Sequence, residues 1–177
     1  MNTETDWRHR HSIRYQGYDY RQDGAYFVTI CTRDRGCVLG DVVEGQVQLS
    51  EIGEIAESAW HGLGRHLHDV VLDAFVVMPN HVHGVLWLRH AEPDVDGHGI
   101  RRRLSLADVV RSYKSLTTRA YWRANPVEDS ERSSQLWQRN YYERIVRNER
   151  ELGVIREYIA LNPGRWSEDR ENLAHIP

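Results

Sequence analysis

Two histidines one residue apart are the first candidates for chemistry in this chain. The run "FVVMPNHVHGVLWL" places His81 and His83 directly after Pro79-Asn80. In a β-strand, residues i and i+2 point to the same face, so the two imidazoles would lie side by side and could share one cation. The pair alone is equally consistent with two hydrogen-bonded histidines at a strand end. A third histidine two residues on, as in nucleotide-hydrolysing histidine-triad proteins, is absent because that position is Val85.

A second group of candidates lies in "IREYIALNP" near the C-terminus. Tyr158 and Asn162 are four residues apart, which on a helix places them on one face about one turn apart. The carbonyl oxygen of an asparagine suits a hard divalent ion and would complete a His, His, Asn site. A phenol with a pKa near 10 is a poor nucleophile at neutral pH, but an adjacent cation lowers that pKa and polarises a phosphate. Taken singly, Tyr158 is equally an ordinary half-buried aromatic and Asn162 a residue at a helix end.

Basic residues are concentrated in three parts of the chain, although the formal net charge is −3. Lys114 is the only lysine, so nearly every cation is a guanidinium, which favours bidentate phosphate contacts. The clustering predicts an anionic partner. The three groups are Arg8, Arg10, Arg14 and Arg21; then Arg101, Arg102, Arg103, Arg111, Lys114, Arg119 and Arg123; then Arg139, Arg144, Arg147 and Arg150.

The elements that must position these residues follow from hydrophobic periodicity. We expect strands at Gly24–Thr32, Val70–Met78 and His81–Leu88, a hairpin within residues 33–50, and helices at Ser50–Leu63, Leu104–Ala124 and Asn148–Pro163. Ser50 and Ser105 are the expected N-caps, and Asn162-Pro163 the expected stop of the last helix, because a residue before proline resists the helical region. The segment Gln135–Asn148 has no clear pattern. This order predicts an α+β fold with helices packed on an antiparallel sheet and a ferredoxin-like core.

Composition indicates one soluble domain spanning residues 1–177, with a polar N-terminal extension (1–17) and an acidic tail (167–177) for which solvation is the simplest account. No apolar run has the length of a transmembrane helix, and a cytoplasmic location is expected. Cys31 and Cys37 fit a reducing compartment without a disulfide framework, and their spacing is unusual for zinc.

The segments "VVMPNHVHGVLWL" and "WQRNYYERIVRNERELGVIREYIALNPGRW" resemble the tyrosine transposases of the HUH (His-hydrophobic-His) superfamily. The nearest likeness is to the transposases associated with repetitive extragenic palindromes (REP), relatives of those of insertion sequence 200-like elements. The similarity extends from about Tyr18 to Trp166. The Pro-Asn-His-Val-His segment, "IVRNEREL" and "EYIALNP" occur in the family's order and spacing.

The resemblance implies a catalytic role for Tyr158 as the nucleophile and metal-ligand roles for His81, His83 and Asn162, with Mg²⁺ or Mn²⁺ as the ion. Some relatives have glutamine at the place of Asn162. It further implies a single-stranded DNA endonuclease and strand transferase that cleaves and rejoins DNA beside palindromic hairpins through a 5′-phosphotyrosine. The protein would act as a monomer or a homodimer. The cations expected to contact DNA are Arg14, Arg101, Arg102, Arg103, Arg111, Lys114, Arg119, Arg139, Arg144 and Arg147.

The sequence leaves other candidates for the nucleophile, for base stacking and for the function. Tyr113, Tyr121 and the Tyr141-Tyr142 pair are other phenols, which we interpret as packing or base-stacking residues. The pair does not match a two-tyrosine Rep-type site, because adjacent tyrosines diverge on a helix. Trp122, Trp137 and Tyr142 are the aromatics that could stack on unpaired bases, although core packing is the favoured role of Trp137. A non-catalytic hairpin-binding protein derived from a transposase is the main rival function. A structural zinc-binding or RNA-binding domain would leave Tyr158 and Asn162 unexplained.

Overall fold

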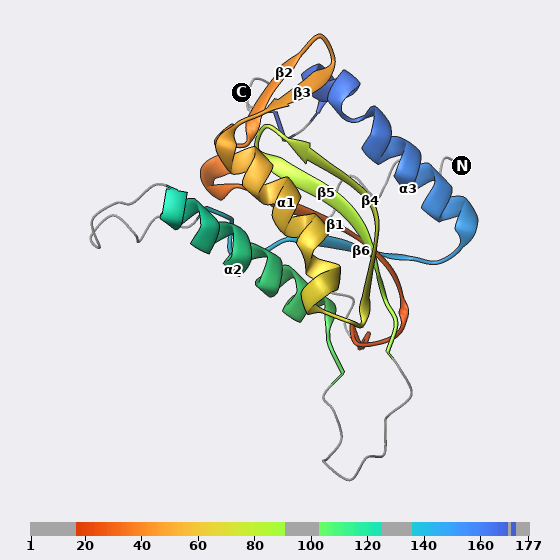
Figure 1. The fold of residues 1–177 in the computed structure, drawn as a ribbon. Coiled ribbons are helices and arrows are strands. Elements are labelled where there is room, and N and C mark those ends of the chain that lie inside the picture. Colours follow the sequence, from red (N-terminus) through yellow and green to blue (C-terminus); the bar gives the residue numbers. More distant parts are fainter. Residues whose placement is uncertain (1–16, 91–102, 125–135, 170, 173–177) are drawn as a thin grey trace.

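The core of the protein is a four-stranded antiparallel sheet (Figure 1). A computed structural model describes residues 17–90, 103–124, 136–169 and 171–172. The sheet consists of β1 (Gly24–Cys31), β4 (Val70–Met78), β5 (His81–Leu88) and β6 (Tyr142–Val146), in the order β4-β5-β1-β6. A separate hairpin of β2 (Gly40–Val43) and β3 (Gln46–Leu49) follows the short 3-10 helix η2 (Arg33–Arg35).

Three α-helices pack on the two faces of this sheet. α1 (Glu51–His66) and α2 (Leu106–Ala124) lie together on one face, and α3 (Glu149–Leu161) lies on the other (Figure 1). The chain therefore runs β1-α1-β4-β5-α2-β6 through the sheet, which is the ferredoxin-like arrangement, and α3 is an addition to it. The predicted fold class is confirmed. Among the described residues, none of the helices has both the length and the apolar character to cross a membrane.

Polar side chains fix where the helices begin. Ser50 accepts a hydrogen bond from the backbone N–H of Gly53 at the start of α1, as predicted. Ser105 accepts one from the N–H of Asp108, whose carboxylate in turn accepts from the N–H of Ser105, a reciprocal cap of α2. Asn148 caps α3 through the N–H of Glu151. Each cap satisfies a backbone donor that the helix itself leaves unpaired.

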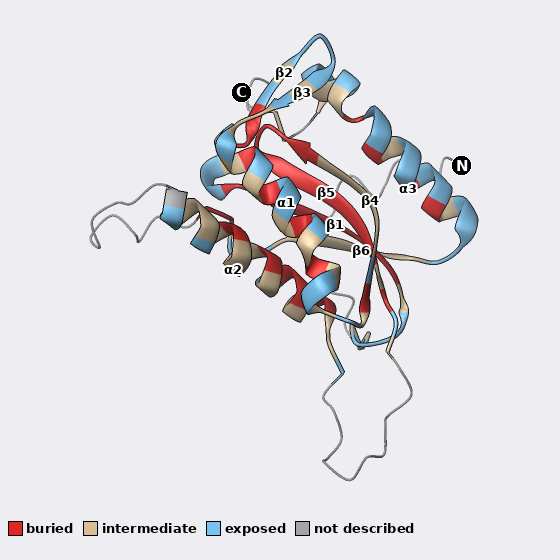
Figure 2. Cartoon of the chain, in the orientation of Figure 1, coloured by how far each residue is buried: buried red, intermediate tan, exposed pale blue. Residues whose placement is uncertain are grey.

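Alternation along β5 decides which side chains face the helices. Val82 and Leu86 belong to the larger core under α1 and α2, whereas Val85 packs with α3. His81 and His83 have the parity of Val85 and therefore lie on the α3 face. Gly84 has the parity of Val82 and Leu86 and lies under Trp60 of α1, where a Cβ would come within 2.4 Å of the indole ring. Figure 2 shows the buried residues concentrated in β1 and β5.

The end of α3 differs from the prediction. The α-helix does end at Leu161, but Asn162 keeps helical angles (φ −57°, ψ −44°) although proline follows it. Our expectation that the residue before Pro163 would leave the helical region was wrong. The chain continues as the 3-10 helix η3 (Pro163–Glu168), whose first position needs no N–H donor, and the N–H of Arg165 donates to the carbonyl of Asn162 at 3.0 Å. Asn162 thus continues the helical path that carries Tyr158.

β6 is the strand that the sequence pattern left unassigned. Its five residues are all half-buried and pair with β1, from Ala25 opposite Val146 to Thr29 opposite Tyr142. Because β6 is short and lies at the edge of the sheet, it shows no continuous apolar run and no clean alternation.

Candidate functional site

The two histidines of β5 form the centre of the candidate site. Pro79-Asn80 is a two-residue turn that pairs Met78 with His81 at the end of the β4-β5 hairpin. The Nε2 atoms of His81 and His83 lie only 3.0 Å apart. Both residues are buried, with exposed fractions of 0% and 4%. Two ring nitrogens aimed at one point in the interior are suited to binding a single cation.

Hydrogen bonds on the far side of each ring hold this orientation. The side-chain N–H₂ of Asn80 donates to the carbonyls of Arg35 and Glu171, so its Oδ1 faces Nδ1 of His81, at 2.9 Å. An oxygen acceptor there requires a proton on Nδ1, which leaves a lone pair on Nε2 of His81. Nδ1 of His83 is hydrogen-bonded to the hydroxyl of Thr29, at 2.8 Å. Such outer contacts fix the tautomer and the orientation of histidine ligands in metal sites.

Both imidazoles are neutral at physiological pH. Burial, followed by the nearby positive charge of Arg35, lowers the pKa of His81 to about 3. Burial is also the main reason why the pKa of His83 lies well below its usual value, with a further contribution from His81. Neutral imidazole is the form that binds a metal ion.

α3 brings Tyr158 into contact with His83, and Asn162 follows one helical turn later. The phenolic oxygen of Tyr158 lies 3.2 Å from Nε2 of His83, and the two rings are 5.2 Å apart. Asn162 is 3% exposed, and within the described residues its Oδ1 is a buried oxygen without a hydrogen-bond partner. An unpaired buried carbonyl oxygen costs free energy unless a ligand satisfies it. The chemistry of these donors, two imidazole nitrogens and an amide oxygen without a partner among the described residues, is of the kind that binds a divalent ion.

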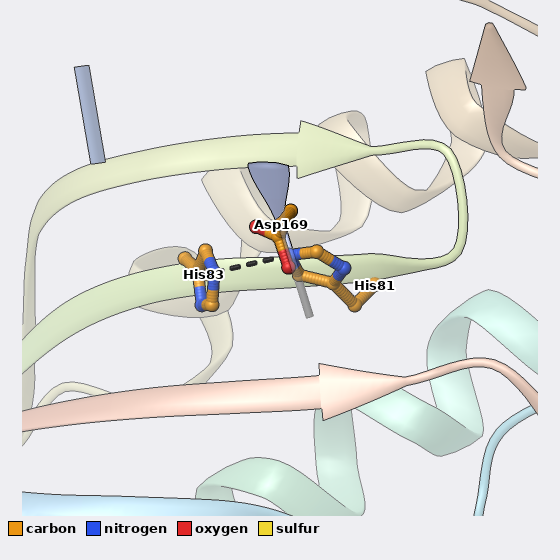
Figure 3. A group of neighbouring side chains, drawn as sticks. All are labelled: His81, His83 and Asp169. Atoms are coloured by element: carbon orange, nitrogen blue, oxygen red, sulfur yellow. Dashed lines mark hydrogen bonds between the residues drawn. The ribbon is translucent and has the colours of Figure 1, made fainter. Parts of the chain in front are cut away.

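Asp169 is a residue of the site that sequence reasoning missed. Its carboxylate and one ring nitrogen of each histidine lie within 4.8 Å of one another. Figure 3 shows its side chain facing the two imidazoles. We had interpreted the acidic residues after Trp166 as a solvated tail. An acidic residue a few positions beyond Asn162 was the available signal, but the sequence does not reveal that η3 turns the chain back over the histidines.

Glu171 also packs against this region rather than serving as a solvated charge. Its carboxylate pairs with Arg35 at 3.2 Å and accepts a bond from the Cys31 thiol at 3.6 Å. Burial, followed by the charge of Glu171, raises the pKa of that thiol. Cys37 is exposed, and neither cysteine belongs to the group of His81, His83 and Asp169 that lies together among the described residues.

The cations that we expected to contact DNA are dispersed. Arg14, Arg101 and Arg102 lie outside the described residues, and Arg103, Arg139 and Arg147 are exposed. Arg111 and Arg119 are on α2, across the sheet from Tyr158, where they bond to Asp108 and Ser115. Arg144 pairs with Glu151 of α3. Their contacts with DNA stay predictions.

Lys114 has a clear structural role. Its ammonium donates to the carbonyls of Gln138, Arg139 and Asn140, at 2.8, 3.3 and 3.0 Å. Burial lowers its pKa to about 8. This side chain ties α2 to the segment that leads into β6, whatever else it contacts.

The alternative phenols lie elsewhere. Tyr113 is fully buried and donates to the carbonyl of Ala56 in the core. Tyr121, on α2, contacts the ring of Trp122. Trp137 is buried and its indole N–H donates to Thr117, in agreement with the packing role that we favoured. Tyr142 lies opposite Thr29 in the sheet register. Tyr158, in contrast, contacts His83 directly.

Comparison with known proteins agrees with this geometry. The family described as "Transposase IS200 like" matches residues 25–162, most of the chain. An uncharacterized protein of Haemophilus influenzae is 32% identical over 172 residues, which cover 92% of each chain. The solved structure of a REP-associated tyrosine transposase bound to a REP hairpin superposes with a TM-score of 0.58 at 20% identity, over 88% of this chain and 75% of that one.

The fold of this chain is thus similar to that of a solved tyrosine transposase. The match over residues 25–162 settles the family: the chain belongs to the IS200-like transposases. The family assignment suggested by the His-x-His segment and "EYIALNP" is confirmed.

Proposed function

We propose that this protein is a divalent-metal-dependent endonuclease and strand transferase for single-stranded DNA, with Tyr158 as its covalent nucleophile. The observation that carries the proposal is the position of the Tyr158 phenol, 3.2 Å from Nε2 of His83, beside the nitrogen pair. The buried Oδ1 of Asn162, which has no partner among the described residues, supports it. A nucleophile and a cation site in contact are what phosphoryl transfer through tyrosine requires.

His81, His83 and Asn162 are the proposed metal ligands. The ion, Mg²⁺ or Mn²⁺, would polarise the scissile phosphate and favour the ionised phenol. Asp169 is a candidate fourth ligand and second oxygen donor, because its carboxylate lies within 4.8 Å of the ring nitrogens. On that assignment, Asp169→Asn weakens Mn²⁺ binding measured by calorimetry, and an unchanged affinity would remove Asp169 from the ligand set.

The proposed reaction is a single phosphoryl transfer to Tyr158, which can be reversed. Tyr158 Oη forms a bond to phosphorus while the bond from phosphorus to the 3′-oxygen breaks, and that oxygen takes up the proton released by the phenol. The 5′ end of the DNA remains on Tyr158 as a phosphotyrosine. Attack by a 3′-hydroxyl reverses the step, so that cleavage and rejoining need no external energy source.

The substrate proposed is a DNA hairpin, such as a REP-like palindrome, with single-stranded DNA beside the stem. The REP hairpin bound to the structural neighbour supports this choice, together with the arginines that we expect to contact phosphates. A non-catalytic hairpin-binding protein is the second candidate, and it is disfavoured because the proposed nucleophile contacts His83 and the two histidines lie together with Asp169.

The test is a trapping experiment with hairpin DNA and Mn²⁺, followed by denaturing electrophoresis. The wild-type protein should form a covalent adduct that is lost with a chelator, in Tyr158→Phe and in His81→Ala. Tyr121→Phe is the matched control, because this tyrosine lies on α2, on the opposite face of the sheet, and should leave the adduct unchanged. Hairpin binding without any adduct would favour the non-catalytic alternative.

A further inference from the structure

α3 is held on the sheet by a charged contact at each edge. At the β6 edge, Arg144 pairs with Glu151, and a carboxylate oxygen of Glu151 also accepts from the N–H of Arg147, at 2.9 Å. At the β4 edge, the guanidinium of Arg156 donates to both oxygens of Asp73, at 2.8 and 2.6 Å. The helix thus spans the strand order β6-β1-β5-β4, with one ion pair on each outer strand.

A β-bulge prepares Asp73 for this contact. Leu72 pairs with Leu86 and Phe75 with Gly84, so Asp73 and Ala74 together oppose the single residue Val85. The extra residue switches the alternation of β4. Phe75 stacks on Trp60 under α1, while Ala74 packs with the α3 cluster and Asp73 reaches Arg156.

The Asp73 carboxylate is also held by hydrogen bonds that do not involve Arg156. The indole N–H of Trp87 donates to its Oδ2 at 3.2 Å, and the N–H of Ala74 donates to its Oδ1 at 2.7 Å. The Asp73 side chain is 14% exposed, whereas that of Arg156 is 48% exposed. An acceptor with so little freedom sets the position of the bidentate guanidinium, and with it the position of α3.

Apolar contacts beneath α3 do not by themselves set its position along the sheet. The buried cluster on this face consists of Phe27, Val85, Leu152, Ile155 and Ile159, and five half-buried side chains pack against it: Ala74, Val76, Trp87, Val146 and Tyr158. Figure 2 shows α3 largely exposed on its outer side. Apolar packing decides which face of the helix is buried, but it is non-directional, so small shifts along the sheet cost it little. Catalytic groups, in contrast, need placement to about 0.5 Å.

We propose that Asp73, through its bidentate contact with Arg156, is a positioning residue that places Tyr158 against His83. This inference rests on the proposed function, because it concerns the reaction of that phenol. Arg156 is two residues before Tyr158, so a shift of the helix at the Asp73 contact moves the phenol relative to the histidines. Asp73 itself touches neither the histidines nor, on this account, the DNA.

The experiment separates binding from chemistry in Asp73→Asn, Arg156→Gln and the double variant. Hairpin affinity measured in chelator should stay within about two-fold of wild type, since no proposed DNA contact is removed. The single-turnover rate of adduct formation, at saturating DNA and Mn²⁺, should fall about ten-fold or more in each single variant. The double variant should be no slower than the slower single variant, because both substitutions break the same contact.

Two further variants keep the test specific. Arg156→Lys retains the charge without the planar fork and should show an intermediate rate. Glu157→Gln changes a charge at the next exposed position of α3 and should react like wild type. Adduct rates in Arg156→Gln and Asp73→Asn within two-fold of wild type would overturn the inference while the proposed function stands. A wild-type protein that forms no adduct would instead overturn the proposed function, and this inference with it.

Discussion

The phenolic oxygen of Tyr158 lies 3.2 Å from Nε2 of His83, although 75 positions separate the two residues in the chain. The contact joins α3 to β5, the strand that follows the Pro79-Asn80 turn. It exists because His83 faces away from the core of α1 and α2, toward the side of the sheet that α3 covers. Everything proposed for this protein depends on that contact and on the donors around it.

Asn162→Leu should have opposite effects on stability and on metal binding. It removes a buried oxygen without a partner among the described residues, so the metal-free protein should be as stable as wild type or more stable. It should also abolish the rise in melting temperature that Mn²⁺ gives the wild-type protein. Thermal unfolding with and without Mn²⁺ checks both effects. Equal Mn²⁺ stabilisation in the variant and in wild type would exclude Asn162 as a ligand.

Thr29 offers a matched pair of substitutions behind His83. Thr29→Val keeps the shape but removes the hydroxyl bonded to Nδ1, and should weaken Mn²⁺ binding about ten-fold or more, as the loss of such outer contacts does elsewhere. Thr29→Ser keeps the hydroxyl and should bind Mn²⁺ nearly as tightly as wild type. Calorimetric titration of the three proteins measures the difference. If the Thr29→Val and Thr29→Ser variants bind Mn²⁺ with the same affinity, the hydroxyl does not orient His83.

The Asp73–Arg156 pair predicts a pH dependence of stability. The hydrogen bonds from Arg156 are the main cause that lowers the pKa of Asp73 from 3.8 to about 2. A carboxylate whose pKa is lowered by folding stabilises the protein above its unfolded pKa and loses that effect as the pH falls through its folded pKa. Asp73→Asn should therefore cost about 1 kcal/mol at pH 6.

That cost should shrink as the pH falls from 4 toward 2. Urea unfolding of Asp73→Asn and wild type across this range gives the difference directly. A difference that is constant with pH would mean that the carboxylate is not the stabilising form.

Two glycines should respond oppositely to alanine. Gly84→Ala places a methyl group 2.4 Å from the Trp60 ring in the buried core and should cost about 1–3 kcal/mol of unfolding free energy. Gly153→Ala, in α3, meets nothing within 4 Å and should stabilise the protein by about 0.5–1 kcal/mol, because alanine favours helix. Denaturant unfolding of both variants is the check. A neutral Gly84→Ala would contradict the close packing of α1 on β5.

Much of the fold was accessible from sequence because the signals were local. Apolar runs rich in β-branched and aromatic residues mark β1, β4 and β5, and Ser50 and Ser105 mark the starts of α1 and α2. β6 was not predicted, because a short edge strand that is half-buried throughout has no periodic pattern of apolar residues. The backbone conformation predicted for Asn162 was wrong, because Pro163 begins a 3-10 helix rather than ending helical structure.

For the site, the identities were easier to predict than the surroundings. His81 and His83 share a face by strand parity, and Tyr158 and Asn162 by helix spacing. Asp169 could not be placed, since its approach to the histidines depends on the path of the chain after η3. The Asp73–Arg156 contact likewise depends on a β-bulge, which shifts the alternation of β4 and has no mark in the sequence.

The most direct test of the central claim is to identify the residue that carries DNA after reaction with a hairpin and Mn²⁺. Trypsin cleaves after Arg156 and Arg165, which isolates Tyr158 as the only tyrosine of the peptide EYIALNPGR. The account predicts that mass spectrometry finds the nucleotide on this peptide, at Tyr158. A nucleotide on NYYER, which holds Tyr141 and Tyr142, or on any other peptide would contradict it.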